Sequence, residues 1–437
     1  MTIDRWRRKD TYVDYPGAGI NSRADEMDSS TGSADKGSPL QPGPHGVSST
    51  HYADGIQTVV PMGDLRAEYE SLKTEIDSAI RRVIASGKFV FGEEVEEFEE
   101  EFARYCGARC AVGVGSGTAA LHLALLALDL QPGDEVITVP NTDSPTTTAI
   151  THAGASIVWV DTDPATFTID PTKIEEKITA RTKAILPVHL FGHPADMDSI
   201  MNLARIHDLV VIEDAALAVG AKYRGRKVGA IGDIACFSLA PSKILGAYGD
   251  AGVVVTNRAD VAERIRVLRN YGHSPDMKVD DRDPIGIRAW RVLEEGYNER
   301  LDTLQAAILR AKLPTLDQRI AARRRAAARY NELLRELDLI PPYESPLVNH
   351  VYLAYTILIE QREEARDFLA ARGIASRLYY IPPLHLQEIY RRLGFGQGDL
   401  PVSESTAARM LSLPVFPQIS DSQIEGVASA LAEFLAR

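Results

Sequence analysis

Lys243 is the lysine whose sequence environment best fits a reactive amine. It lies in a loop of small and polar residues between two apolar runs, residues 234–239 and 253–255, which read as buried strands. The loop itself is therefore expected inside the protein. A lysine held there can lose its proton and form a Schiff base with an aldehyde. This segment predicts a nucleophilic amine.

A glycine-rich turn supplies a second chemical feature. Residues 113–121 read GVGSGTAAL and connect a strand-like run to a helical one. Backbone N–H groups and the positive end of a helix dipole make such a turn a good site for an anion. The same letters also fit a plain tight turn, and the residues alone leave both interpretations open.

A third feature is a carboxylate at a strand end. Asp214 closes the apolar run LVVIED, residues 209–214. Ligands of open α/β sheets bind outside the carboxyl ends of the parallel strands, so Asp214 is a candidate binding residue. Its neighbour Glu213 should face the other side of the sheet, because strand side chains alternate. The alternative role for Asp214 is the N-cap of a following helix.

Strand-like and helical segments alternate through the region that carries these residues. Between residues 110 and 257, short runs rich in Val and Ile are separated by segments with helical spacing. This pattern predicts an α/β fold, with a mostly parallel central sheet and helices on both faces. Helical spacing also appears over residues 64–86 and 93–102, ahead of the first expected strand.

The chain is 437 residues long, which predicts more than one structural part. Residues 1–56 are rich in Ser, Gly, Asp and Pro, and we expect them to form a disordered leader. A large α/β domain is expected over residues 57–310. Over residues 311–437, long charged helices precede short strand-like pieces, which predicts a smaller C-terminal α+β domain.

Composition excludes some classes of partner and compartment. The formal net charge is −13, which argues against nucleic acid as a main partner. No apolar run reaches membrane-spanning length and no apolar segment follows the basic N-terminal residues, so neither a membrane anchor nor a secretory signal is expected. The three cysteines, Cys106, Cys110 and Cys236, fit free thiols in a reducing cytoplasm, and nothing near them completes a metal site.

Three segments together resemble one known family. They are FSLAPSKILGAYGDAG around Lys243, GVGSGTAAL, and GYNERLDTLQAAIL at residues 296–309. They resemble the DegT/DnrJ/EryC1/StrS family of sugar aminotransferases that use pyridoxal phosphate (PLP), and the resemblance covers residues 59–437. It implies fold type I of the PLP-dependent enzymes, with pyridoxamine phosphate (PMP) as the second form of the cofactor. It also implies that Lys243 binds PLP as a Schiff base and later moves a proton.

The resemblance assigns roles to other residues. Gly117 and Thr118 would bind the cofactor phosphate together with the Ser238 hydroxyl. Asp214 would keep the ring nitrogen protonated, which makes the ring a better electron sink. Asn298 would reach the phosphate in the neighbouring subunit, which implies a homodimer with shared active sites.

Three further residues are candidates for contact with the substrate. His189 lies in PVHLFGHPADMD, which resembles a family segment near the cofactor, and the alternative for it is a core histidine. His385 lies in PPLHLQ, which matches a family loop that approaches the sugar, and it could instead simply pack. Asp143 is a carboxylate that is new in this chain, close to the expected ring position.

Several positions depart from the pattern of the family. Leu217 replaces a glutamine that hydrogen-bonds the phenolic oxygen of the cofactor, and Ser144 stands where an aromatic residue stacks on the ring. Leu353 and Tyr379 replace two histidines. These changes leave Lys243 and PLP in place, but they alter the pocket in which the substrate would lie.

The implied function is transfer of an amino group from L-glutamate or L-glutamine to a keto sugar, with a nucleotide-linked sugar as the first candidate. Such a step serves the synthesis of amino sugars, polysaccharides or natural products. The alternatives are an aminotransferase or dehydratase that acts on a non-nucleotide sugar or carbocyclic ketone, and a non-catalytic PLP-binding regulator. A Rossmann dehydrogenase is disfavoured, because no G-x-G-x-x-G follows the first expected strand.

Overall fold

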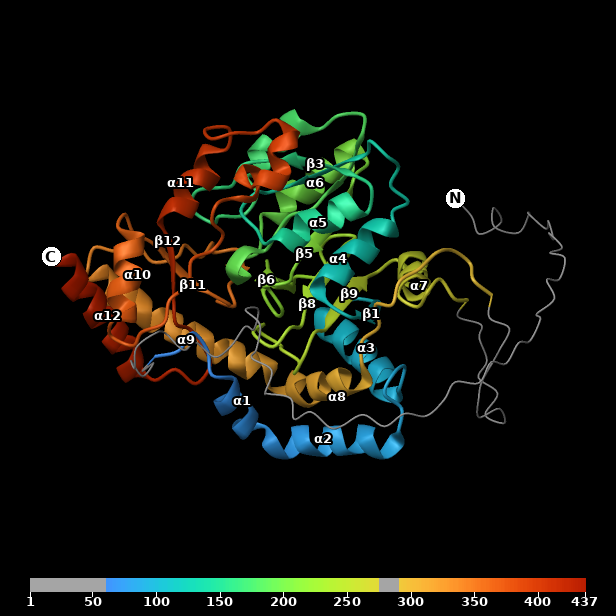
Figure 1. Ribbon diagram of the computed structural model, residues 1–437, viewed down its shortest axis with the longest axis horizontal. Helices are drawn as coiled ribbons and strands as arrows, with labels where there is room; N and C mark the ends of the chain where they lie inside the picture. The colour runs from blue at the N-terminus through green and yellow to red at the C-terminus, as the bar shows by residue number, and fades with distance from the viewer. Residues whose placement is uncertain (1–59, 275–290) are drawn as a thin grey trace, which may run out of the picture. The chain divides into compact units, whose positions relative to one another are not determined.

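The computed structural model describes residues 60–274 and 291–437, which belong to one compact unit (Figure 1). The leader predicted at residues 1–56 lies outside the described residues. Over the described ranges, no helix combines the length and the apolar character needed to cross a membrane.

A seven-stranded sheet forms the centre of this unit (Figure 1). In spatial order its strands are β1 (Cys110–Val114), β9 (Gly252–Thr256), β8 (Ile234–Ser238), β5 (Val210–Asp214), β4 (Thr182–Ile185), β2 (Glu135–Thr138) and β3 (Ser156–Trp159). β9 pairs antiparallel with both of its neighbours, and every pair from β8 to β3 is parallel. The predicted α/β fold with a mostly parallel sheet is confirmed.

The central strands are buried on both faces, which explains their nearly continuous apolar sequences. In β9, Val253 and Val255 belong to the same hydrophobic cluster as Phe237, whereas Val254 belongs to the cluster that contains Leu121. Because strand side chains alternate, these two clusters lie on opposite faces of the sheet. The sheet is thus the middle layer of three.

Helices form the two outer layers. One hydrophobic cluster takes residues from α3 (Glu93–Cys106) and α8 (Thr303–Lys312); the other takes residues from α4 (Gly117–Leu126), α5 (Ser144–His152), α6 (Met197–His207) and α7 (Ala259–Leu268). α4 follows β1 directly, and the Ser116 hydroxyl accepts a hydrogen bond from the Ala119 N–H over 3.0 Å. This N-cap fixes the start of α4 at the carboxyl end of β1.

The helical spacing over residues 64–86 corresponds to two helices rather than one. They are α1 (Leu65–Ser71) and α2 (Lys73–Ser86), and Leu72 between them leaves the helical conformation with φ −128°. The side chain of Leu72 is buried and packs with Ile76 and Ile308. Burial of this residue against α8 accompanies the break in the helical path.

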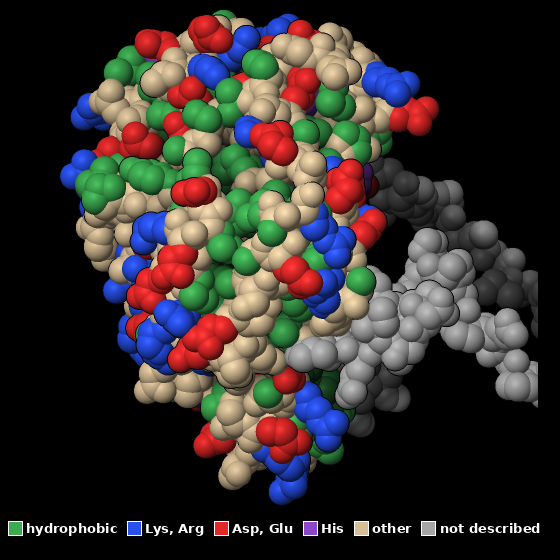
Figure 2. All heavy atoms as spheres, turned by 90° about the vertical axis from the view of Figure 1, so that its left-hand side faces the viewer, with side chains coloured by type: hydrophobic (Ala, Val, Ile, Leu, Met, Phe, Trp, Pro, Cys, Tyr) green, Lys and Arg blue, Asp and Glu red, His purple; other side chains and the backbone are tan. Residues whose placement is uncertain are grey.

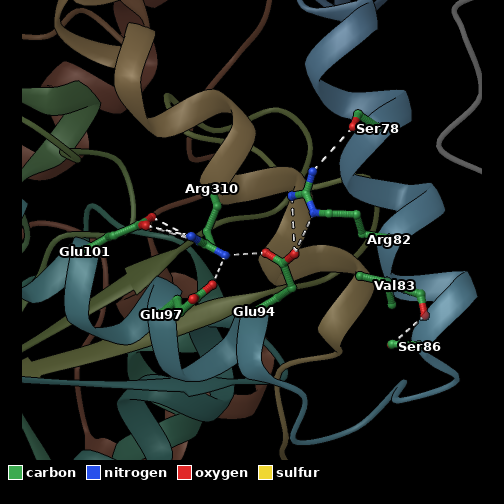
Figure 3. A network of polar contacts seen from close by, with 8 residues as sticks. All are labelled: Ser78, Arg82, Val83, Ser86, Glu94, Glu97, Glu101 and Arg310. Carbon is green, nitrogen blue, oxygen red and sulfur yellow. Dashed lines mark hydrogen bonds and ion pairs between the residues drawn. The ribbon is translucent and has the colours of Figure 1, made fainter.

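A network of charged side chains ties α2, α3 and α8 together (Figure 3). Arg310 of α8 lies among three acidic residues of α3 and bonds to Glu94 over 2.5 Å, to Glu101 over 2.9 Å and also to Glu97. Glu94 in turn pairs with Arg82 of α2 over 3.2 Å. Networks of this kind hold geometry better than isolated surface pairs do. α8 is therefore fastened to its neighbours along its outer side.

The C-terminal residues form a further group of elements, at the left in Figure 1. They include α9 (Leu316–Arg335), α10 (Arg362–Ala370), α11 (Pro401–Arg409), α12 (Asp421–Leu435) and the antiparallel pair β11 (Tyr355–Leu358) and β12 (Met410–Leu413). Tyr330, Tyr355 and Leu431 belong to a separate hydrophobic cluster in this group. The boundary at residue 310 stays a prediction.

Short elements complete the described chain. A three-stranded ribbon has the order β10 (Val348–Asn349), β6 (Lys222–Tyr223) and β7 (Arg226–Lys227). The 3₁₀ helices are η2 (Pro171–Lys173), η3 (Glu175–Lys177), η4 (Leu190–Gly192), η5 (Leu313–Thr315), η6 (Leu384–Leu386) and η7 (Glu388–Leu393). Figure 2 shows the face at the left of Figure 1, where acidic and basic side chains are interspersed rather than gathered by sign.

Candidate active site

The loop that carries Lys243 connects β8 to β9 and folds back on itself. The Leu239 N–H donates to the Ala251 carbonyl over 2.8 Å, and the Ala247 N–H donates to the Leu239 carbonyl over the same distance. The Lys243 N–H donates to the Ala240 carbonyl over 2.9 Å. These bonds give the loop a defined path, so the position of the Lys243 side chain is set by backbone contacts.

The environment of Lys243 favours a neutral amine. Burial lowers the pKa of Lys243 below its usual value, while the negative charges of Asp214 and Asp143 oppose that shift. A neutral lysine amine is a nucleophile, whereas the ammonium form is not. The structure therefore brings Lys243, Asp214 and Asp143 close enough for their charges to interact, as a nucleophilic lysine near a candidate binding carboxylate requires.

Asp214 ends β5 as a buried carboxyl group. Its Oδ2 accepts a hydrogen bond from the Thr146 hydroxyl over 2.7 Å, and its Oδ1 accepts one from the Ala216 N–H over 3.1 Å. Burial raises the pKa of Asp214, and these hydrogen bonds together with the charge of Lys243 oppose the shift. Two fixed donors orient the carboxyl group, and Asp214 can hold a proton shared with a basic nitrogen.

The turn after β1 packs against the end of β8 without space for a side chain. A Cβ on Gly117 would lie 2.6 Å from the Ser238 Cβ and 3.2 Å from its Oγ. A Cβ on Gly252 would lie 2.1 Å from the Ser116 carbonyl oxygen. Glycine at these two positions lets the Ser238 hydroxyl approach the N-terminus of α4. We name this the Gly117–Ser238 cradle, and Thr118 is exposed beside it.

The cradle has the chemistry of an anion site. The first N–H groups of α4 lack partners within the helix and carry the positive end of its dipole. A hydroxyl group beside them adds a further donor. The segment of Asn298 lies close by, because the Gly115 N–H donates to the Glu299 carbonyl over 3.3 Å. Asn298 itself forms an isolated bridge with Asn270, and its contact with a neighbouring subunit stays a prediction.

His189 is fully buried and has protein partners at both ring nitrogens. Its Nε2 lies 3.0 Å from Oε2 of Glu213, and its Nδ1 accepts a hydrogen bond from the Ala195 N–H over 3.1 Å. Glu213 also accepts hydrogen bonds from the backbone of residues 229–232, on the side of β5 away from Asp214. These contacts favour a structural role for His189 over the expected contact with substrate.

The other two substrate candidates differ in their settings. His385 is fully buried, with Nε2 3.1 Å from Oε1 of Glu404, while its Nδ1 has no partner among the described residues. Asp143 is exposed, and its Oδ1 accepts a hydrogen bond from the Ser144 N–H over 2.8 Å as the N-cap of α5. The charge of Asp143 acts on Lys243, whereas the His189 N–H donates to the Asp214 carbonyl over 3.0 Å and its ring points to Glu213.

Two further residues, Thr146 and Tyr380, lie at this site and could not be predicted from sequence patterns. Thr146, in α5, donates a hydrogen bond from its hydroxyl group to Asp214 at the end of β5. Tyr380 comes from the C-terminal part of the chain, and burial together with the charges of Asp143 and Asp214 raises the pKa of its phenol well above the usual value. A threonine in TTT and a tyrosine in LYY have no spacing that points to chemistry, so only the fold could find them.

The positions that depart from the family pattern lie in different environments. Leu217 is nearly buried within the hydrophobic cluster of α4 and α5. Ser144 is exposed at the first turn of α5. Tyr379 lies against the rings of Phe191 and Tyr380, with centroids 5.9 Å and 5.3 Å apart. The aromatic side chains around Tyr379 therefore come from other segments than the one that carries Ser144.

The residues present fit a cofactor that has an aldehyde, a basic ring nitrogen and a phosphate. Lys243 supplies the amine, Asp214 supplies a buried and oriented carboxyl group, and the Gly117–Ser238 cradle supplies donors for an anion. Residues 60–274 and 291–437 contain no group of three or more His, Cys, Asp or Glu side chains that could hold a metal ion.

Comparisons with known proteins agree with this arrangement. A model of the DegT/DnrJ/EryC1/StrS aminotransferase family matches residues 70–432. A pleiotropic regulatory protein of Geobacillus stearothermophilus is 45% identical over 378 residues, which are 86% of this chain and 98% of the relative. The dTDP-3-amino-3,4,6-trideoxy-alpha-D-glucose transaminase of Streptomyces venezuelae is 43% identical over 379 residues, which are 86% of this chain and 97% of the relative.

Solved structures give the same result. DesV of S. venezuelae, in complex with a ketimine intermediate, has a TM-score of 0.81 and 43% identity, and the match covers 86% of this chain and 99% of that one. NtdA of Bacillus subtilis, with bound PMP, has a TM-score of 0.79 and 30% identity, and covers 88% and 87% of the two chains. The chain therefore belongs to the DegT/DnrJ/EryC1/StrS aminotransferase family, and its cofactor is PLP, which alternates with PMP.

Proposed function

We propose that this aminotransferase moves an amino group from L-glutamate or L-glutamine to a nucleotide-linked keto sugar. The observation that carries the proposal is the placement of Lys243 near the oriented carboxyl group of Asp214 in a family member. The substrate class is supported by relatives whose names specify dTDP-linked and UDP-linked amino sugars, at 43% and 42% identity. Both align with more than four fifths of this chain.

Each residue of the site has a distinct task in this reaction. Bound PLP supplies an electron sink for negative charge that develops on the substrate carbon. Asp214 holds a proton at the ring nitrogen, and Thr146 keeps the carboxyl group in the orientation for it. The Gly117–Ser238 cradle would hold the phosphate through the first N–H groups of α4 and the Ser238 hydroxyl.

Lys243 serves first as nucleophile and then as base. Burial lowers its pKa and so increases the share of neutral amine at a given pH, and both tasks require the neutral form. With the amino donor bound in its place, the freed Lys243 amine would take a proton from the substrate carbon and hold it for return. The reverse sequence with a keto sugar completes the amino transfer.

The keto sugar would lie beside Asp143 and Tyr380. Both approach Lys243 or Asp214 closely enough to interact with their charges, and neither is part of the cradle. A carboxylate and a phenol can together accept from and donate to sugar hydroxyl groups. His385 stays a candidate for the same pocket, because its Nδ1 is buried and has no partner in the described part of the chain.

A homodimer with shared active sites in the cytoplasm completes the proposal. Apolar side chains are exposed together beside Asn298, where the Tyr271 N–H donates to the Tyr297 carbonyl and the Arg300 guanidinium covers Phe91 and Tyr271. The exposed set is Phe89, Val90, Phe91, Tyr271, Val292, Leu293 and Tyr297. Exposed apolar side chains close to one another are typical of a protein interface, and a second copy bound there would place Asn298 at it.

The shared-site arrangement has a direct test. Lys243→Ala and Asn298→Ala should each be inactive as pure dimers. When the two variants are unfolded, mixed and refolded together, hybrid dimers should hold one intact site and recover activity. A mixture that stays inactive while mass spectrometry confirms hybrid dimers contradicts shared sites.

A catalytic protein is favoured over a PLP-binding regulator. The regulatory description of one relative belongs to that protein. In this chain, both the lysine and the carboxylate that chemistry needs are present and held in position. Incubation with ¹⁵N-labelled L-glutamate and a panel of dTDP-linked and UDP-linked keto sugars should transfer the label to one of them. Failure with all of them, alongside transfer to a non-nucleotide ketone, would favour the alternative substrate class.

A further inference from the structure

A buried ion cluster lies behind the lysine loop. Lys312, the last residue of α8, is fully buried, and its ammonium group pairs with Oε1 of Glu68 in α1. The second oxygen of Glu68 pairs with Arg319 of α9 over 2.7 Å. One carboxylate thus serves two cations from different helices, away from the Gly117–Ser238 cradle.

The same ammonium group also contacts the catalytic loop. Lys312 Nζ donates a hydrogen bond to the carbonyl oxygen of Gly246, just beyond Lys243. It also lies 5.1 Å from the centroid of the Tyr248 ring. Nearby, Oε1 of Gln305 accepts a hydrogen bond from the Tyr248 N–H over 2.8 Å. Two side chains of α8 therefore hold two consecutive parts of the loop.

Gly246 lies where the loop is tightest. A Cβ at this position would lie 2.4 Å from the Pro241 carbonyl oxygen, so the chain crosses itself too closely for any side chain. The next residue, Ala247, donates its N–H to Leu239 and closes the loop. The Gly246 carbonyl therefore lies between Lys243 and the Ala247–Leu239 hydrogen bond. One donor to it can fix the orientation of this peptide group.

The anchor of this donor is rigid. α8 is fastened to α3 through Arg310, on the outer side of the helix (Figure 3). A buried ammonium is costly unless it is paired, and Glu68 provides that pairing. Burial lowers the pKa of Lys312, and the charge of Glu68 opposes that shift. A hydrogen bond from an ammonium group paired with a carboxylate is stronger than one between neutral groups.

We propose that Lys312 is a positioning residue, which fixes the Gly246 carbonyl so that the Lys243 amine faces the cofactor aldehyde. The inference rests on the proposed function, in which Lys243 is the residue that bonds to PLP. In that step the amine nitrogen joins the aldehyde carbon, and the aldehyde oxygen leaves as water. Lys312 touches neither group and acts only through the loop.

Two variants separate positioning from stability. Lys312→Met removes the donor to Gly246 but leaves Glu68 paired with Arg319. Glu68→Gln keeps the donor but leaves two cations without their carboxylate. We expect Glu68→Gln to lower the melting temperature more. We expect Lys312→Met to slow covalent attachment of PLP more, by about tenfold.

The attachment rate is measured on apo protein mixed with PLP, by borohydride reduction at timed intervals and intact mass. Hydrogen exchange over residues 239–251 should rise in Lys312→Met and much less in Glu68→Gln. The matched control is Arg362→Met, since Arg362 also donates to a backbone carbonyl, that of Ala407, and pairs with Glu363 outside the loop. It should leave both the attachment rate and the loop exchange unchanged.

Several outcomes overturn the proposal. The first is a folded Lys312→Met variant that attaches PLP at the wild-type rate. The second is a set of variants whose attachment rates fall only in proportion to their melting temperatures. If Lys312→Met does not fold, Gln305→Ala replaces it, because it removes the other contact from α8 to the loop and should slow attachment in the same way. Wild-type protein that forms no borohydride-trapped adduct at Lys243 would refute the proposed function itself, which is a different result.

Discussion

Thr146 donates a hydrogen bond to Asp214 over 2.7 Å, although the two residues are 68 positions apart in the chain. The donor lies in the first turn of α5, the helix that follows β2. The acceptor ends β5, and one strand, β4, separates β2 from β5 in the sheet. This bond joins the segment that carries Ser144 to the carboxyl group that we propose for the cofactor ring nitrogen. The orientation of Asp214 thus depends on a side chain of α5.

Replacement of Thr146 by valine tests that dependence. The substitution keeps the shape of the side chain and removes the donor, so Asp214 loses one of its two fixed hydrogen bonds. We expect kcat to fall about tenfold or more, since hydrogen bonds to charged groups contribute roughly 1.5–3 kcal/mol. Thr148→Val, in the same helix and half-buried, is the control and should keep normal turnover. Equal activity of the two variants would contradict the role of Thr146.

The glycine of the cradle should tolerate no side chain. Gly117→Ala would push a methyl group against Ser238 and displace the first turn of α4, so PLP affinity should fall at least about tenfold. Gly426→Ala is the control, because its Cβ would meet no atom within 4 Å in α12. That change should keep PLP affinity and raise stability by up to about 1 kcal/mol. Titration by cofactor absorbance and thermal melts measure both effects.

The lowered pKa of Lys243 should make the stability of the apo protein depend on pH. The folded state disfavours the charged lysine, so between the lowered pKa and the usual value of 10.5 the unfolded state binds more protons. Above pH 10.5 the lysine is neutral in both states and does not destabilise the fold. As pH falls from 10.5 through the lowered pKa, the free energy of unfolding decreases, because only the unfolded state readily takes up the proton. Lys243→Met should be more stable than wild type at neutral pH, by a margin that narrows as pH rises toward 10.

Urea unfolding of the two apo proteins from pH 7 to pH 10 measures this margin. Lys222→Met, at a half-buried lysine in the small ribbon, is the control for the loss of a lysine. A margin that stays constant or widens with pH would mean that the Lys243 pKa is not lowered.

His189 should matter for stability more than for substrate binding. Its two ring nitrogens are occupied by Glu213 and Ala195, and its loss would leave a fully buried carboxylate short of a partner. We expect His189→Leu to cost about 2–4 kcal/mol of unfolding free energy, with little change in KM of the folded enzyme. A stable variant with a strongly raised KM for the keto substrate would instead restore His189 as a substrate contact.

The sequence could predict the parts of the site that are local. Lys243, Asp214 and the Gly117 turn lie at strand ends, and strand ends are visible as apolar runs bounded by polar or glycine residues. The parallel sheet then places those ends at one edge, so their convergence follows from the fold class. The α/β fold itself was predictable for the same reason.

Contacts between distant segments could not be predicted. Thr146, Tyr380 and the pair of Lys312 with Glu68 act through partners that no spacing in the sequence connects. Lys312 reads as one more basic residue of an amphipathic helix, yet it is fully buried. His189 shows the opposite case, because a motif near the cofactor suggested chemistry where the three-dimensional partners leave both nitrogens occupied.

The central claim is that Lys243 holds PLP in an enzyme that accepts nitrogen from an amino acid. An absorption scan of the PLP-loaded protein before and after addition of L-glutamate tests it most directly, with Lys243→Ala as the control. The account predicts that the visible band of the bound cofactor falls while the near-ultraviolet band of PMP grows, in wild type only. An unchanged visible band with L-glutamate and with L-glutamine, or the same conversion in Lys243→Ala, would contradict it.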